Sequence, residues 1–172
     1  MKGSTQKEFG FTLIELILVI ALLSIALTIT TINLIRPTTQ VKLNTQSEDI
    51  YSIVKEAQNK AINTNIGNGS QSDHWGVHFE ASKYVLFKGD TYDSADANNF
   101  VTTNPQNIVI NPNLPCPSPP GDCQNIVFQR ISGEVKNYDN TKNSICITET
   151  ASNKNKLLLI NFIGTLIIQN GC

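Results

Sequence analysis

Hydrophobic residues form two regions with different patterns along the chain. From Leu16 to Ile35 no residue carries a charge, and the stretch from Leu16 to Leu27 is apolar on every side except at Ser24. At 1.5 Å per residue this run would span ~30 Å as a helix, which matches the hydrocarbon thickness of a bilayer. A buried core helix is the alternative, but such helices seldom exceed ~14 residues without a polar face. The pattern therefore predicts a membrane-spanning helix over 11–36.

A second helical pattern follows Pro37, where a kink or break is expected because proline cannot donate a backbone hydrogen bond. Between 37 and 66 the apolar residues at helical spacing are Ile50, Ile53, Val54, Ala57 and Ala61. Charged residues occupy much of the remaining surface and are interpreted as a solvated face. The sequence Gly67-Asn68-Gly69 supplies residues that commonly end a helix. This region is predicted to be an amphipathic helix that continues into a globular head.

Beyond residue 67 the hydrophobic period shortens from about 3.6 residues to about 2, which is typical of strands. The candidate strands are His74 to Glu80, Lys83 to Lys88, Asn107 to Ile110, Asn125 to Arg130, Glu134 to Tyr138, Ser144 to Thr150, Lys156 to Phe162 and Thr165 to Gln169. Ser132-Gly133 and Ile163-Gly164 are predicted hairpin turns. The segments 89–106 and 111–124 are predicted surface loops. Because no helical pattern separates the strands, 67–172 is predicted to be an antiparallel β head.

The overall composition is that of a folded protein. Lys plus Arg number 13 against 14 Asp plus Glu, and 40% of the residues are apolar. This balance excludes a disordered tail, a collagen-like chain and a basic nucleic-acid coat. The sequence contains no G-x-S-x-G elbow, P-loop, H-E-x-x-H or paired-carboxylate motif. An enzyme is therefore not expected, and no cofactor is predicted.

The segment before the apolar run, MKGSTQKEFG, carries Lys2 and Lys7. Positive charge on this side keeps it in the cytoplasm, so the C-terminal head is predicted to lie outside. No A-x-A site of the kind that signal peptidase uses follows the apolar run. Glu15 is a single carboxylate within the apolar helix, where a charge costs ~3 kcal/mol near the centre of a span. Glu15 is therefore a candidate functional residue that needs a cationic partner.

The sequence G-F-T-L-I-E before an apolar helix resembles the class III leader of type IV pilins and type II secretion pseudopilins. The resemblance implies that a prepilin peptidase cleaves between Gly10 and Phe11 and methylates the new amino terminus of Phe11. It also implies that Glu15 is the assembly glutamate, which pairs with the terminal amine of a neighbouring subunit. Inside lipid such a pair removes the cost of two isolated ions.

The head carries a second resemblance. Ala57, Ala61 and Ile62, together with IVFQRISGEV and LLLINFIGTLIIQNGC, resemble the GspH/FimT family of minor pseudopilins. The resemblance implies an α+β, pilin-like fold, in which a long N-terminal helix packs on two antiparallel sheets. The implied domains are a leader peptide at 1–10, a transmembrane or filament-core helix at 11–36, an amphipathic helix at 37–66 and a β head at 67–172.

The function implied by these resemblances is that of a minor pseudopilin, a structural subunit of a type II secretion pseudopilus or related type IV filament that acts in protein secretion. The implied partners are other pilin or pseudopilin subunits, the prepilin peptidase, the inner-membrane assembly platform and the lipid bilayer. The implied location is the bacterial inner membrane, as a single-pass protein with a periplasmic or extracellular head, before assembly into the filament.

Three alternatives stay open: a FimT-like minor pilin that binds DNA during uptake, a major pilin, and an anchored β domain with no filament role. Binding DNA needs clustered cations. Residues 1–10 hold Lys2, Lys7 and Glu8, so the remaining chain carries two more acidic than basic side chains. Lys154 and Lys156 form the only close basic pair near the end of the chain. DNA is therefore a disfavoured partner.

The four cysteines all lie in the predicted exported head, where an even number favours disulfides. The favoured pairing joins Cys116 to Cys123, which closes the Pro-rich loop, and Cys146 to Cys172, which ties the last residue to a core strand. The two other pairings stay open, because sequence does not fix connectivity. A metal site is not predicted, since no C-x-x-C occurs.

Asp90, Asp93 and Asp96 lie in one loop and raise the possibility of a calcium site. The alternating spacing and closing Glu of an EF-hand are absent, so a solvated acidic loop is favoured. His74 and His78 lie four residues apart in a predicted strand, a distance of ~13 Å that is too large for one shared metal ion. Both histidines, and Trp75 between them, are expected at the surface or partly buried.

Overall fold

The computed structural model describes residues 12–63, 73–115 and 123–172, and within the helix the side chains of 28–39 lie outside that description. The chain divides into two compact units, Met1–Thr38 and Thr39–Cys172. Each unit is described separately below. The predicted cleavage residues Gly10 and Phe11 lie outside the described residues.

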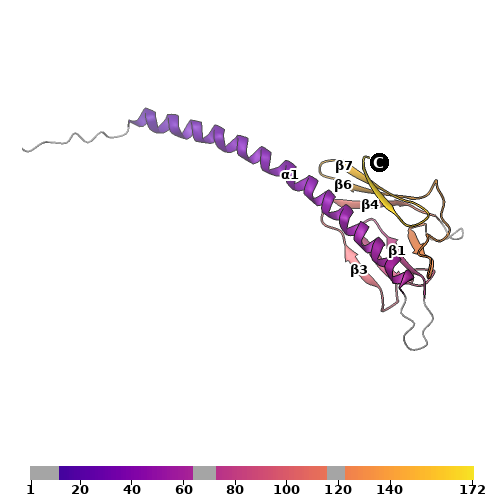
Figure 1. Cartoon of the computed structure of the whole chain (residues 1–172). Helices are drawn as coiled ribbons and strands as arrows, with labels where there is room; N and C mark the ends of the chain where they lie inside the picture. Colours follow the sequence, from indigo (N-terminus) through magenta and orange to yellow (C-terminus); the bar gives the residue numbers. More distant parts are fainter. Residues whose placement is uncertain (1–11, 64–72, 116–122) are drawn as a thin grey trace, which may run out of the picture. The chain divides into compact units, whose positions relative to one another are not determined.

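One long helix, α1 (Leu13–Ile62), contributes to both units (Figure 1). It is continuous through Pro37, so the break expected there does not occur. A proline removes a single hydrogen bond from a helix, and the bonds of the neighbouring turns remain available to continue it. The helix ends at Ile62, earlier than the predicted residue 66, and the glycine-rich segment expected to end it lies outside the described residues.

The unit Thr39–Cys172 contains two four-stranded antiparallel sheets. The first has the order β3-β2-β1-β5, and the second has the order β4-β6-β7-β8. The strands are β1 (Trp75–Phe79), β2 (Lys83–Lys88), β3 (Phe100–Thr103), β4 (Ile108–Asn113), β5 (Asn125–Phe128), β6 (Ser144–Glu149), β7 (Lys154–Ile160) and β8 (Leu166–Asn170). Every paired neighbour is antiparallel. The predicted α+β class, with a helix and two antiparallel sheets, is confirmed.

The second part of α1, from Thr39 onward, supplies one side of the core. The stripe predicted from helical spacing is buried, since Ile50, Val54, Ala57 and Ala61 are all 0% exposed. The same apolar cluster includes Phe79 from β1 and residues from both sheets, so helix and sheets share one core. Two alanines in the stripe leave room for the sheets to approach the helix closely, and the large side chains around them exclude water.

Three local predictions are wrong. Strand β3 lies inside the segment 89–106 that was predicted to be a loop, and β4 continues to Asn113 where a loop was predicted from residue 111. The segment Glu134 to Tyr138 is not a strand, because within it only Val135 forms a bridge, to Phe128. Its backbone bonds are divided between two neighbours, since the Lys136 N–H donates to the Val127 carbonyl at 2.8 Å and the Val135 N–H donates to the Phe162 carbonyl at 2.9 Å.

Candidate functional site

The N-terminal end of α1 places Glu15 in a capping arrangement. Its Oε2 accepts hydrogen bonds from the Thr12 backbone N–H at 3.2 Å and from the Thr12 hydroxyl at 3.1 Å. The Thr12 hydroxyl oxygen in turn lies 3.4 Å from the Glu15 backbone N–H. This reciprocal pattern is the capping box of a helix start, which satisfies donors that have no partner within the helix. Glu15 is thus held at the beginning of α1, directly after the predicted cleavage site.

The first part of α1 presents apolar side chains to solvent all around its axis. Leu16, Val19, Leu23 and Leu27, for example, are 57%, 45%, 57% and 65% exposed. The Ser24 hydroxyl does not provide a polar face, because it donates to the Ile20 carbonyl at 2.8 Å. The large apolar side chains described between Leu13 and Leu27 are therefore exposed to solvent.

Within the described part of the chain, no helix combines the length and the hydropathy that a membrane crossing requires.

The cysteines of the head form disulfides. Cys146 in β6 is bonded to Cys172, with the Cα atoms 5.9 Å apart. This is the pair that the sequence favoured for tying the end of the chain to a core strand. Cys123 is also disulfide-bonded, and its predicted partner Cys116 lies outside the described residues. The bond to Cys172 holds the segment after β8 against the sheet.

The three aspartates of the acidic loop make different contacts. Asp90 forms an ion pair with Lys136 at 2.8 Å, and its Oδ1 lies 2.8 Å from Nδ1 of His74. Asp93 and Asp96 accept hydrogen bonds from backbone N–H groups of their own loop. Bonds from the backbone and then the side chain of Asn98 hold the pKa of Asp96 below its ordinary value. Among the residues described, no group of three or more His, Cys, Asp or Glu side chains is arranged to hold a metal ion.

His78 is buried, at 4% exposure, and not at the surface or partly buried as expected. Its Nδ1 lies 2.7 Å from Asn125 Oδ1 on the neighbouring strand β5. The Tyr92 ring stacks on the imidazole with a centroid distance of 4.0 Å. On the other side of the ring, Nε2 lies 3.5 Å from Glu80 Oε1. A polar group can be buried when it is hydrogen-bonded, and these neighbours provide that pairing.

Gln58 connects α1 to both sheets, although its position in the apolar stripe gave no sign of this role. Its Nε2 donates to the carbonyls of Gly133 at 2.8 Å and Ile163 at 2.7 Å. Its Oε1 accepts a hydrogen bond from the Lys55 ammonium at 2.9 Å. The same ammonium also donates to the Gly164 carbonyl at 3.1 Å. The Gly133 turn follows β5 of the first sheet, and the Ile163 turn joins β7 to β8 of the second.

The glycine at each turn is required by the helix beside it. A Cβ on Gly164, which has φ +77°, would come within 2.4 Å of Gln58 Nε2 and 2.7 Å of the Phe128 ring. A Cβ on Gly133, at φ +67°, would meet Ile62 at 2.5 Å. These contacts explain why this head has a glycine both in the turn after β5 and in the turn between β7 and β8.

Ile131, in the turn after β5, has φ 72° and is 67% exposed. A β-branched residue rarely adopts this left-handed conformation, which is strained for it. Its backbone N–H donates to the Ala61 carbonyl at 3.0 Å in the last turn of α1. The strained turn is therefore bonded to the end of the helix.

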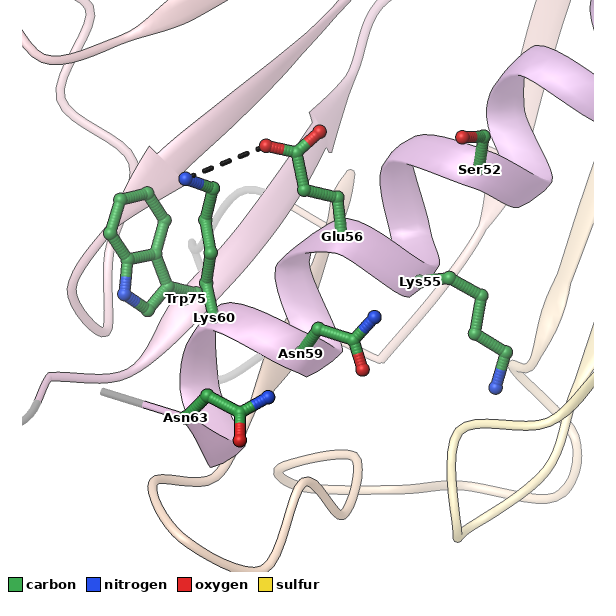
Figure 2. A pocket seen from close by; sticks show the side chains of 7 residues that line it. All are labelled: Ser52, Lys55, Glu56, Asn59, Lys60, Asn63 and Trp75. Atoms are coloured by element: carbon green, nitrogen blue, oxygen red, sulfur yellow. Dashed lines mark ion pairs between the residues drawn. The ribbon is translucent and has the colours of Figure 1, made fainter. Parts of the chain in front are cut away.

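A groove of about 650 Å³ lies on the outer side of the last turns of α1 (Figure 2). It is lined by Ser52, Lys55, Glu56, Asn59, Lys60, Asn63 and Trp75. The Lys60 ammonium lies 4.8 Å from the centre of the Trp75 ring and 3.5 Å from Glu56 Oε1. The groove therefore offers amides, a hydroxyl and an ion pair, which suit hydrogen bonding rather than bond-making chemistry.

Comparison with known proteins gives two findings and one negative result. The prokaryotic N-terminal methylation motif matches residues 5–31, a range that includes Gly10, Phe11 and Glu15. The structure is similar to the minor pseudopilin EpsH from the type 2 secretion system of Vibrio cholerae, with a TM-score of 0.50 and 14% identity. That match covers 75% of this chain and 97% of the EpsH chain. No curated protein sequence matches the chain.

The chain thus combines a prepilin-type methylation motif with the fold of a minor pseudopilin, and the resemblance to type IV pilins and pseudopilins is confirmed. From Leu13 onward the range of the motif lies in α1.

Proposed function

We propose that the protein is a minor pseudopilin, a structural subunit of a type II secretion pseudopilus or a closely related type IV filament, and that it acts in protein secretion. One combination of features carries the proposal: the methylation motif over 5–31 precedes a head with the minor-pseudopilin fold in the same chain. A head of this fold without the motif would support only the role of a globular domain. The motif alone would not identify which kind of head follows it.

In this proposal, 1–10 is a leader that prepilin peptidase removes, and Phe11 becomes the methylated amino terminus. The segment 11–36 crosses the inner membrane once and later enters the filament core. The head lies on the periplasmic or extracellular side. Other pseudopilins, the peptidase, the assembly platform and the bilayer are the partners.

Glu15 has the chemistry that such an assembly step needs. Its carboxylate is exposed at the start of the helix and is held by Thr12, the residue after the proposed new terminus. A terminal ammonium from a neighbouring subunit can form a charge-assisted bond with the same carboxylate. Pairing lowers the cost of placing either charge in an apolar surrounding. The exposed apolar residues around Glu15 then pack against lipid before assembly and against neighbouring helices afterwards.

The test is the intact mass and the N-terminal residue of the full chain, expressed in cells with and without an active prepilin peptidase. We expect a chain that starts at methylated Phe11 only when the peptidase is present. Gly10→Leu should block this cleavage, whereas Gly3→Ala in the same leader should leave it intact. A chain that keeps Met1 in the presence of the peptidase, or a cut after the apolar run, would contradict the proposal.

A further inference from the structure

A second groove, of about 370 Å³, lies between the second part of α1 and the start of β7. Gln40 and Asn44 line it from the helix, and Lys154, Asn155, Lys156 and Asn170 line it from the sheet. All of these residues belong to the unit Thr39–Cys172. Leu43 and Asn153 also line the groove, so the lining combines two lysine side chains with five carboxamides and is both cationic and rich in hydrogen-bond donors.

Strand geometry brings the two lysines together. Residues two apart on a strand point to the same face, so Lys154 and Lys156 both line the groove. The Lys154 ammonium lies 3.5 Å from Gln40 Oε1, which is a long contact at an exposed position. In the described part of the chain, no side chain forms a hydrogen bond or an ion pair with the Lys156 ammonium. Both charges are therefore available to an external anion.

The nearest acidic group is already occupied. Glu149 lies opposite Lys154 in the ladder between β6 and β7, but it is only 3% exposed. Its Oε2 accepts a hydrogen bond from the Ser152 backbone N–H at 2.7 Å. Lys42 on α1 is close enough to interact electrostatically with the same carboxylate. The carboxylate is thus turned into the structure, while the lysines face the groove.

The disulfide fixes the outer wall of the groove. Cys172 is bonded to Cys146, and the Gly171 backbone N–H donates to the Asn155 carbonyl at 3.2 Å. Asn170 lies directly opposite Lys156 in the ladder between β7 and β8. A wall held in this way needs little rearrangement to bind a ligand, which lowers the entropic cost of binding.

The position in the chain indicates where the ligand would come from. Gln40 follows Arg36, the end of the proposed span, by four residues, and four residues of α-helix rise ~6 Å. Polar headgroups extend ~5–8 Å beyond the hydrocarbon on each side of a bilayer. The groove entrance is therefore within chain reach of the headgroup layer.

We propose that this groove binds the headgroup of an anionic phospholipid, with the two lysines on the phosphate and the carboxamides on the headgroup hydroxyls. The inference rests on the proposed function, because it needs the head to stand at the membrane surface. Phosphatidylglycerol has the matching chemistry, one phosphodiester charge and two free hydroxyls. The contact would hold the head on the bilayer until the subunit is extracted into the filament.

The test uses the full chain in uncharged detergent micelles, with the backbone amide resonances of Asn155 and Asn170 as reporters. Short-chain phosphatidylglycerol is titrated in, and short-chain phosphatidylcholine is titrated in a parallel sample. We expect saturable shifts with phosphatidylglycerol at a concentration about tenfold lower than any effect of phosphatidylcholine. Lys154→Gln combined with Lys156→Gln should weaken phosphatidylglycerol binding about tenfold, since each exposed charge contact contributes up to ~1 kcal/mol.

The matched control combines Lys88→Gln with Lys142→Gln, which removes the same charge from exposed lysines that do not line the groove. It should leave the titration unchanged, and equal weakening would overturn the inference in favour of general charge attraction. Inorganic phosphate that saturates the same shifts at the same concentration would show a free-anion site. A short DNA duplex that acts at lower concentration than the lipid would show a nucleic-acid site.

The two proposals fail in different ways. Loss of lipid binding in a chain that is still processed at Phe11 contradicts the groove inference alone. An unprocessed chain that still binds phosphatidylglycerol through the two lysines contradicts the pseudopilin proposal alone.

Discussion

The two parts of helix α1 use hydrophobic residues in opposite ways. From Leu13 to Leu27 the large apolar side chains are all exposed, between 45% for Val19 and 77% for Leu13. From Thr39 to Ile62 the apolar residues form a stripe, and Ile50 and Val54 in that stripe are fully buried. One continuous helix thus contains a segment that the folded chain covers and a segment that it leaves uncovered.

This difference shows that α1 is helical both where its apolar side chains are buried and where they are exposed. Local hydrogen bonds and the Thr12 cap are sufficient to begin the helix, whereas burial needs a partner. In the second part the partner is the β head. Under the proposed function the partner of the first part is lipid or another subunit, because large exposed apolar patches are unfavourable in water.

The sharpest test of this comparison truncates one large side chain in each part. Ile50→Ala removes a buried side chain from the core and should lower the free energy of unfolding of the head by about 4 kcal/mol. Leu18→Ala removes a 57% exposed side chain and should leave that free energy unchanged within about 0.5 kcal/mol. Urea unfolding of the full chain in micelles, followed by Trp75 fluorescence, measures both. Equal losses in the two variants would remove the distinction between the parts.

The disulfide at the end of the chain should have the next largest effect, again only on the head. Replacing both Cys146 and Cys172 by Ala opens a loop with a sequence separation of 26. In the chain-entropy account this costs about 3 kcal/mol. The same urea series should show the loss, and proteolysis should cut first in the β7–β8 hairpin. A double variant with unchanged stability and unchanged proteolysis would show that the last hairpin does not depend on the bond.

The glycine turns that contact the buried part of α1 give a smaller effect. Gly164→Ala should be about 2 kcal/mol more destabilising than Gly89→Ala, because the added Cβ collides with Gln58 and Phe128. Gly89 is the control, since it also has a positive φ, +111°, but its Cβ would meet nothing within 4 Å. The difference in thermal midpoint between the two variants isolates the contact from the backbone strain. Equal midpoints would mean that the turn can move away from the helix.

The smallest expected effect is on the stability of the head at low pH. A side-chain hydrogen bond with Ser152 is the main cause that holds the pKa of Glu149 below its ordinary value of 4.5. Because the folded-state pKa is the lower one, this group stabilises the fold above about pH 4.5, and the contribution is lost as pH falls through the folded-state pKa. Glu149→Gln should therefore reduce the drop in thermal midpoint between pH 7 and pH 3. Glu48→Gln, at an exposed position on α1, should not change that drop.

Sequence patterns predicted the parts of the fold that depend on neighbours close in the chain. The stripe from Ile50 to Ala61 follows helical spacing, and the last hairpin follows alternation around Gly164. Strand β3 was missed because Phe100–Thr103 is short, and three of its four residues are exposed, so it has little alternation to detect. Its place in the sheet depends on pairing with β2.

The polar residues inside the head could not be predicted from the sequence in the same way. His78 can be buried because Oδ1 of Asn125, 47 residues away, lies 2.7 Å from its Nδ1 and accepts a hydrogen bond there. Gln58 is buried because two carbonyls, 75 and 105 residues away, accept its amide hydrogens. A local pattern contains none of these partners. By contrast, Glu15 could be recognised without any knowledge of the fold, because a single charge in an apolar run is unusual.

The bonds around Gln58 have a mechanical consequence for a subunit that is pulled by its helix. The amide of Gln58 and the ammonium of Lys55 join the helix to turns from both sheets, and Ala61 adds a backbone bond to the strained turn at Ile131. A force along the helix axis would load these bonds together rather than one after another. If the subunit is extracted through its helix, as the proposed function requires, bonds that are loaded together resist rupture better than bonds loaded one by one, so the head should follow the helix as one body.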